Sequence, residues 1–200
     1  TDGRSIMLHC PAEAYAFVYS DEINMESVGV YLKEVLATHL PENVENITLH
    51  LREEIINSPF YHYTHGLKKH DGNCQRIAHG HRSRIDIILD GKVSTESQQY
   101  WADRWADIYI ATREDEIAYS DRKLKGEVAN AEDYYCFAYE SSQGYFELLI
   151  PKSDCEVIET DSTVECLAQY LLEEQKKRTP DGVCQVIAYE GVGKGATVKG

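Results

Sequence analysis

Two segments of the sequence repeat the same order of elements, and this repeat constrains the fold more than any other feature. Residues 6–54 and 146–191 each begin with an apolar stretch that ends at a proline, Pro11 or Pro151. Each continues through a stretch of helical periodicity and closes with an alternating segment that ends in a glutamate. Such internal similarity indicates one supersecondary unit used twice. Chance similarity between two amphipathic helices is the alternative, and the matching prolines and glutamates count against it.

Both helical stretches carry a single apolar stripe. Apolar residues recur at i, i+3, i+4, i+7 and i+8, as in a helix that buries one face; they are Val28, Tyr31, Leu32, Val35 and Leu36, and Val164, Leu167, Ala168, Leu171 and Leu172. Ser27 is a candidate cap for the first helix, and Ser162 or Thr163 for the second. Pro41 and Pro180 lie just beyond the stretches, where neither can continue a helix.

Strand-like segments make up much of the remainder. β-rich runs bounded by turn residues predict further strands at 60–64, 85–90, 134–139 and 145–150. Residues 113–133 have mixed charge and no strong period, and we expect an exposed excursion there. Trp101 and Trp105 lie one helical turn apart and are expected in the core. The pattern predicts the α+β class, with an antiparallel sheet and long helices packed on one of its faces.

The two copies of the repeat differ in what precedes them. The second follows two strands, a short helix and a hairpin (residues 58–150), whereas the first begins almost at Thr1. The sequence therefore predicts two modules: residues 1–57 as a partial module that holds only the second half, and residues 58–200 as a complete module. Our hypothesis is that a longer precursor supplies the missing front half.

The charge balance excludes two classes of partner. Asp and Glu total 34 against 20 Lys and Arg, which gives a net charge of −14. Nucleic acid requires a basic face and an anionic membrane attracts basic segments, so neither is expected to bind. No apolar run approaches the roughly 20 residues that span a bilayer. Six cysteines are too few for a disulfide scaffold and most lie in apolar runs, which favours free thiols and a cytoplasmic location.

Histidines concentrate in one short part of the chain. His79 and His81 are two residues apart, so on a strand both imidazoles project from the same face. His65 lies on the preceding predicted strand, which can pair with theirs and supply a third nitrogen. Three histidines with an open fourth position are typical of a catalytic zinc site. The alternative is that these are ordinary polar surface residues.

Cys74 lies five residues before His79, in a polar stretch. It can be an incidental thiol, a fourth zinc ligand or a general base beside the metal. For the third role, a nearby Zn²⁺ together with Lys68 or Lys69 would lower the pKa of the thiol.

Several motifs together resemble one known family. They are Cys-x4-His-Gly-His (Cys74 to His81) after a lone histidine, the helix start Ser162-Thr163-Val164-Glu165, the strand end Tyr189-Glu190, and a glycine-rich tail. In combination they resemble the 6-pyruvoyltetrahydropterin synthase / 6-carboxytetrahydropterin synthase family over roughly residues 58–200. The resemblance implies the tunnelling fold (T-fold).

The resemblance also implies roles for individual residues. His65, His79 and His81 would hold zinc, and Cys74 would be the catalytic cysteine. Glu190 would bind the guanidine-like edge of a pterin, because a carboxylate accepts two parallel N–H bonds. Further residues beside the pterin would be Ser162, Thr163 and Glu165. Val164 stands where relatives often have threonine.

The implied activity is a zinc-dependent lyase reaction on 7,8-dihydroneopterin triphosphate. We favour 6-carboxytetrahydropterin synthase of the queuosine pathway, with 6-pyruvoyltetrahydropterin synthase as the alternative. A zinc- and pterin-binding paralogue without lyase activity and an unrelated metallohydrolase also remain open. The glycine-rich segment 191–197 is not a Walker motif, since Ala188 stands where the first glycine is needed. We expect a tight turn there with Lys194 exposed, and the less favoured alternative places Lys194 beside a triphosphate.

One family feature is not found in the sequence. Relatives carry an Asp-His pair that serves as a proton relay with the cysteine. Asp107 lies at about the right place and is our candidate, but Ile108 follows it where the histidine is expected. The resemblance further implies a homo-oligomer with sites near subunit interfaces, and unpaired strand edges favour the same state.

Overall fold

The structure is a computed structural model that describes residues 5–52, 54–182, 184–191 and 193–200. It contains two compact units. The larger joins the N-terminal residues as far as Ala14 to Ile56–Gly200, and the smaller is Tyr15–Ile55. This division differs from the expected boundary at residue 57, because a short N-terminal strand belongs to the larger unit. Whether residues 1–57 are half of a module stays a prediction.

The larger unit contains a seven-stranded sheet with the order β11-β10-β3-β2-β5-β9, in which β4 pairs with β3 at one end. Its strands are β2 (Phe60–His65), β3 (His79–Leu89), β4 (Lys92–Val93), β5 (Ile108–Thr112), β9 (Cys155–Ile158), β10 (Cys184–Tyr189) and β11 (Gly195–Lys199). The strands from β11 to β2 pair antiparallel, as predicted, whereas the pairs β2–β5 and β5–β9 are parallel. The strands predicted at 60–64 and 85–90 lie within β2 and at the end of β3.

A second sheet of four strands has the order β1-β8-β7-β6 and is antiparallel. Its strands are β1 (Met7–His9), β6 (Glu116–Ile117), β7 (Tyr134–Ser141) and β8 (Gly144–Pro151). The predicted hairpin is therefore present as β7–β8, and the predicted excursion at 113–133 contributes only the short strand β6. Short 3-10 turns also occur, among them η2 (Gly72–Gln75) and η3 (Arg113–Asp115).

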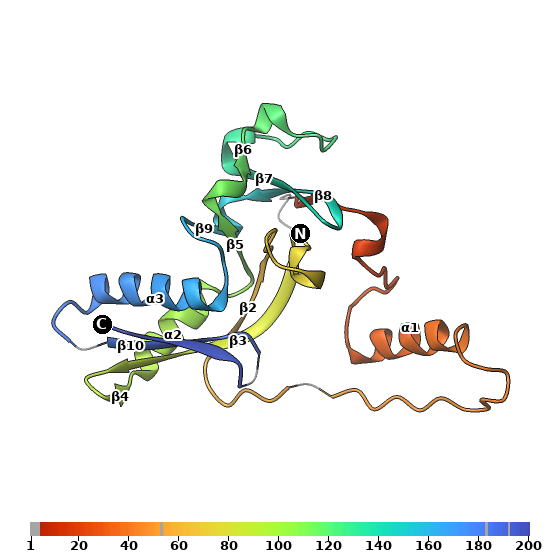
Figure 1. Ribbon diagram of the computed structural model, residues 1–200, viewed down its shortest axis with the longest axis horizontal. Helices are drawn as coiled ribbons and strands as arrows, with labels where there is room; N and C mark the ends of the chain where they lie inside the picture. The colour runs from red at the N-terminus through yellow and green to blue at the C-terminus, as the bar shows by residue number, and fades with distance from the viewer. Residues whose placement is uncertain (1–4, 53, 183, 192) are drawn as a thin grey trace. The chain divides into compact units, whose positions relative to one another are not determined.

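Two helices cover one face of the large sheet. They are α2 (Thr95–Arg104), which lies beside β3 and β2, and α3 (Val164–Arg178), which lies beside β10 and β11 (Figure 1). The core between them is continuous: the apolar stripe of α3 packs with Trp101 and Trp105 of α2, both fully buried, and with the inward residues of the strands. The Trp101 indole N–H donates to Gln175 Oε1 at 2.9 Å and so joins the two helices. This arrangement confirms the α+β class and the single helical face.

The smaller unit contains one helix, α1 (Met25–Ala37), which the periodicity predicted. Its N-cap is Asn24 rather than Ser27, which instead occupies the third helical position and completes a capping box. The alternating segment that closes the first copy of the repeat, residues 47–53, forms no strand at 47–52, while residue 53 lies outside the described ranges. An alternating apolar pattern decides which face of a strand is buried, but a strand forms only where a partner strand pairs with it, and no described strand pairs with this segment. At 163, by contrast, the expected threonine does cap α3.

None of the helices in the described ranges has the length and hydrophobicity that crossing a bilayer requires. The six cysteines are all free.

Candidate metal centre

Three imidazoles converge where β2 ends and β3 begins. The antiparallel register places His65 directly opposite His79, and Tyr63 opposite His81. Because positions two apart on a strand share a face, all three histidines lie on the face that the helices cover. One ring nitrogen from each lies within 4.8 Å of the others. The predicted convergence is therefore present in the structure.

The nitrogens of these rings divide into two groups. The Nε2 atoms of His65, His79 and His81 are buried and have no hydrogen-bond partner. On the opposite sides of two rings, Nδ1 of His65 lies 2.8 Å from Ser162 Oγ and Nδ1 of His79 lies 3.0 Å from the Arg76 carbonyl. Metal-binding histidines are usually held in this way, with one nitrogen fixed by a hydrogen bond and the other directed at the ion.

Burial favours the neutral form of the three rings. It lowers the pKa of His79 and His81, and it lowers that of His65 well below the usual histidine value, with the neighbouring imidazoles adding to the effect. A neutral imidazole offers a lone pair to a cation. Three unpartnered neutral nitrogens therefore fit a divalent ion such as Zn²⁺, which accepts nitrogen ligands.

A cavity of about 120 Å³ adjoins His65 and gathers most of the predicted site residues. Cys74, Thr163, Glu165 and Glu190 all line it. Its remaining lining comes from Tyr63, Leu67, His70, Val164 and Lys194. Segments far apart in the sequence thus meet at one place: the loop after β2, the start of α3 and the end of β10.

Glu190 lies between the histidines and a lysine. Its Oε1 is 3.8 Å from His81 Nε2, and its Oε2 accepts a hydrogen bond from Lys194 Nζ at 2.8 Å. The backbone turn after β10 produces this contact, since Glu190 N–H donates to the Lys194 carbonyl. The hydrogen bond to Glu190 also raises the pKa of Lys194. Lys194 lines the cavity, and its side chain is 74% exposed in the turn, as the sequence predicted. A place for it beside a triphosphate stays a prediction.

The two hydroxyls at the start of α3 lie in different places. Ser162 is fully buried and directed at His65 instead of lining the cavity, which differs from the substrate contact expected for it. Thr163 caps α3 by accepting a hydrogen bond from Cys166 N–H at 3.4 Å, and it also lines the cavity. The first turn of α3 carries Glu165 on the same side.

Cys74 lies in the 3-10 turn η2, and the histidine cluster in the described part of the chain includes no cysteine. The structure therefore gives no support to a fourth ligand from Cys74. The expectation that Lys68 or Lys69 acts on the thiol stays a prediction; in the structure both ammonium groups form ion pairs with Glu114, and each has one further carboxylate partner. The lysine that shares the cavity with Cys74 is Lys194.

Asp107 is not brought together with Cys74. It lines a different cavity, of about 480 Å³, and its Oδ1 lies 3.7 Å from Nδ1 of His62. Both side chains are exposed, and Asp107 adopts a left-handed backbone conformation with φ of 56° just before β5. Within this chain the relay role expected for Asp107 beside the cysteine therefore has no geometric support.

The sequence analysis missed Tyr63 as a site residue. Its buried ring lies 5.1 Å from that of His65 and 5.3 Å from that of His81, and burial together with Glu190 raises its pKa. A signal was present, because Tyr63 precedes His65 by two residues and so shares its face of β2.

Comparison with known proteins gives a family and several similar structures. The sequence model of the family 6-pyruvoyl tetrahydropterin synthase matches residues 54–200. A variant of 6-pyruvoyltetrahydropterin synthase from Plasmodium vivax is 19% identical, with a TM-score of 0.48, over 72% of this chain and 94% of that one. The Plasmodium falciparum enzyme is 16% identical with a TM-score of 0.47, over 72% and 94%. An uncharacterized Wolinella succinogenes protein is 18% identical with a TM-score of 0.41, over 70% and 93%.

No curated protein matches the chain. The family match covers most of the sequence, including the three histidines, Cys74 and Glu190. It confirms the family predicted from the motifs and the fold class that goes with it. The chain belongs to the 6-pyruvoyl tetrahydropterin synthase family, whose members are pterin-processing lyases.

Proposed function

We propose that this protein is a zinc-dependent lyase acting on 7,8-dihydroneopterin triphosphate, and specifically a 6-carboxytetrahydropterin synthase of the queuosine pathway. The single observation that carries the zinc-dependent part is the convergence of three unpartnered Nε2 atoms beside a cavity that also contains Cys74 and Glu190. Membership of the family supports the pterin substrate.

The proposed metal ligands are His65, His79 and His81. Zn²⁺ bound there would lower the pKa of the hydroxyls on the substrate side chain. The hydrogen bonds to Ser162 and to the Arg76 carbonyl fix two of the rings before any ion arrives. The protein thereby provides an oriented set of nitrogen donors.

The residues of the cavity have separate tasks in this proposal. Glu190 binds the guanidine-like edge of the pterin through two parallel N–H bonds. To do so it exchanges its contact with Lys194, whose ammonium group is then free to approach the triphosphate. Thr163 and Glu165 contact the substrate from the start of α3. Cys74, as thiolate, accepts a proton from the substrate side chain and returns it.

Incubation with 7,8-dihydroneopterin triphosphate tests the proposal. We expect one zinc per chain, release of triphosphate and formation of acetaldehyde. The Cys74→Ala variant should retain zinc and lose turnover, whereas Cys10→Ala, which changes a thiol outside the cavity, should behave as wild type. A pyruvoyl product would replace the proposed enzyme by 6-pyruvoyltetrahydropterin synthase. The absence of any pterin binding would overturn the proposal as a whole.

The position of Asp107 favours one alternative, a zinc- and pterin-binding paralogue without lyase activity. In this chain Asp107 pairs with His62, and the two line a cavity that does not include Cys74. A paralogue would bind pterin tightly, lose that binding in Glu190→Ala and release no triphosphate.

We also propose that the protein is a homo-oligomer with its sites near subunit interfaces, in the cytoplasm. The six free cysteines are consistent with a reducing compartment. The outer strands of the large sheet, β9 and β11, each have one neighbour and leave an edge to which another chain can pair. Sedimentation of the zinc-loaded protein tests the oligomeric state.

A further inference from the structure

The loop that joins β2 to β3, residues 66–78, carries Cys74 and is closed on itself. Leu67 N–H donates to the Cys74 carbonyl at 2.8 Å, so the start of the loop is tied to the cysteine. Further contacts come from three parts of the chain outside the loop, namely η3, the β7–β8 hairpin and the segment before α3, and they lie on both sides of Cys74.

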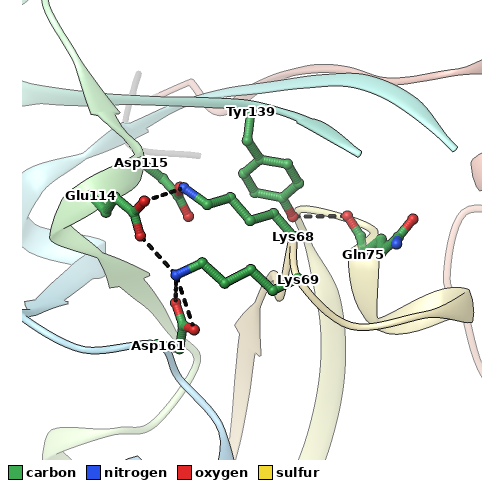
Figure 2. Close-up of polar contacts among 7 residues, drawn as sticks. All are labelled: Lys68, Lys69, Gln75, Glu114, Asp115, Tyr139 and Asp161. Atoms are coloured by element: carbon green, nitrogen blue, oxygen red, sulfur yellow. Dashed lines mark hydrogen bonds and ion pairs between the residues drawn. The ribbon is translucent and has the colours of Figure 1, made fainter. Parts of the chain in front are cut away.

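The first set of contacts consists of ion pairs on the side that precedes Cys74. Lys68 Nζ lies 2.6 Å from Asp115 Oδ1 and 3.2 Å from Glu114 Oε1, while Lys69 Nζ lies 3.0 Å from Glu114 Oε2 (Figure 2). The side chain of Asp115 is only 7% exposed and that of Lys68 21%. A charge pair that is largely shielded from water is held more firmly than a surface pair.

The second set comes from the β7–β8 hairpin and holds the residue after Cys74. The Tyr139 hydroxyl donates to the Gln75 carbonyl at 2.8 Å, as Figure 2 shows, and Ser142 Oγ donates to Gln75 Oε1 at 2.9 Å. Packing here is close: a Cβ atom on Gly66 would lie 2.1 Å from the Tyr139 hydroxyl and 2.7 Å from Ile77 Cα.

A third contact connects the loop with a proposed metal ligand. Lys69 Nζ also lies 3.4 Å from Asp161, and the next residue, Ser162, bonds to Nδ1 of His65. The same short segment before α3 therefore holds both the loop and the His65 ring. Displacement of the loop relative to the histidines is resisted from this side too.

We propose that Lys68, with Asp115, and Tyr139, with the Gln75 carbonyl, are positioning residues that set the place of the Cys74 sulfur relative to the histidine cluster. None of these side chains lines the cavity, so they act through the loop. The inference rests on the proposed function for its catalytic consequence. Errors of about 1 Å in the position of a reacting group can cost up to about a hundredfold in rate.

The test uses the full chain and two readouts. The first is the rate at which iodoacetamide alkylates Cys74 at pH 7.5, resolved by mass spectrometry of the Cys74 peptide. The second is kcat and KM for 7,8-dihydroneopterin triphosphate, with zinc content measured alongside. The variants are Tyr139→Phe, which removes one hydroxyl, and Lys68→Met, with Lys68→Arg as the conservative rescue. Matched controls are Tyr145→Phe, whose hydroxyl bonds to Glu147, and Lys177→Met, whose partner is Glu174.

In Tyr139→Phe and Lys68→Met we expect the alkylation rate to rise and kcat to fall, each by about tenfold, with KM and zinc content nearly unchanged. Lys68→Arg and both controls should stay close to wild type. If Lys68→Met does not fold, Tyr139→Phe decides alone. An unchanged alkylation rate, or an altered rate with unchanged kcat, overturns the inference. Should the wild-type protein lack turnover, the proposed function fails, and the positioning of the loop is still judged by alkylation.

Discussion

At the scale of single residues, the three candidate metal ligands are oriented by side chains outside the histidine cluster. Ser162 is fully buried and its hydroxyl lies 2.8 Å from Nδ1 of His65, so it fixes the orientation of that ring. Such partners of metal ligands commonly contribute 10- to 100-fold, in order of magnitude, to metal affinity. Ser162 has this role because the fold places its hydroxyl beside His65, and the Ser162-Thr163 motif alone does not reveal that placement.

Ser162→Ala is therefore expected to weaken zinc binding by about 10- to 100-fold while leaving the three histidines in place. Competition with a chromophoric chelator measures the affinity. Ser120→Ala is a suitable control, because that exposed hydroxyl bonds to the neighbouring Asp121 at 3.0 Å, away from the histidine cluster. Equal zinc affinity in the two variants would contradict the role assigned to Ser162.

The half-buried thiol of Cys155 predicts a loss of stability at alkaline pH. Burial raises the pKa of Cys155 from 9.0 to about 12. In the unfolded chain this thiol ionises above pH 9, whereas the folded chain keeps it protonated, so rising pH stabilises only the unfolded state. We expect the free energy of unfolding to fall by about 2 kcal/mol between pH 9 and 11 from this group. Urea titrations at several pH values measure this fall. In Cys155→Ala the free energy of unfolding should decrease less steeply with pH; an equally steep decrease would contradict the assignment of the effect to Cys155.

At the scale of elements, the sequence best predicted the helices and strand faces that depend on the spacing of nearby apolar or histidine residues. The stripes that predict α1 and α3, and the alternation that places His79 and His81 on one face, follow from residues a few positions apart. Predictions failed where a partner distant in the sequence determines whether a strand forms or how it pairs. Residues 47–52 form no strand because no described strand pairs with them, and the parallel pairing of β5 with β9 joins residues 46 positions apart, such as Tyr109 and Cys155.

The same limit explains which parts of the site were missed. The ion pairs of Lys68 and Lys69 join residues 45 or more positions apart, and a basic dipeptide in a sequence does not reveal which carboxylates it meets. Three histidines on two adjacent strands were predictable because a single hairpin register brings them together. The placement of Asp107 was not, since it depends on how β5 adds to the far side of β2.

The junction of α2 and α3 offers a test of how the helices are held. Gln175 is fully buried and accepts the indole N–H of Trp101 at 2.9 Å. Gln175→Ala leaves that donor unpaired in the core and opens a small void, so we expect a loss of about 2–3 kcal/mol in the free energy of unfolding. Urea denaturation measures it. Gln169→Ala on the exposed side of α3 should cost less than about 0.5 kcal/mol, and similar losses in both would contradict the argument.

At the scale of the whole molecule, the two units differ in how well they bury apolar side chains. The larger unit contains the entire buried core, whereas no described residue between Tyr15 and Ile55 is buried. Family similarity begins at residue 54, close to where the smaller unit ends. The predicted assignment of residues 1–57 to a partial module remains a hypothesis. A lower local stability of the smaller unit, which the lack of buried side chains among its described residues leads us to expect, can be measured directly.

Native-state digestion with chymotrypsin measures that local stability, because the enzyme cuts after aromatic residues that local opening exposes. Phe17 is 66% exposed and Tyr19 95%, whereas Phe137 and Phe146 in the core are at most 1% exposed. We expect cleavage after Phe17 and Tyr19 first, with Phe137 and Phe146 as internal controls that remain intact until the larger unit unfolds. Mass spectrometry of timed samples gives the order. If Phe17 and Tyr19 resist as long as the core residues, the smaller unit is covered by another surface in solution, and its exposed apolar side chains are an interface rather than a weakly stable segment.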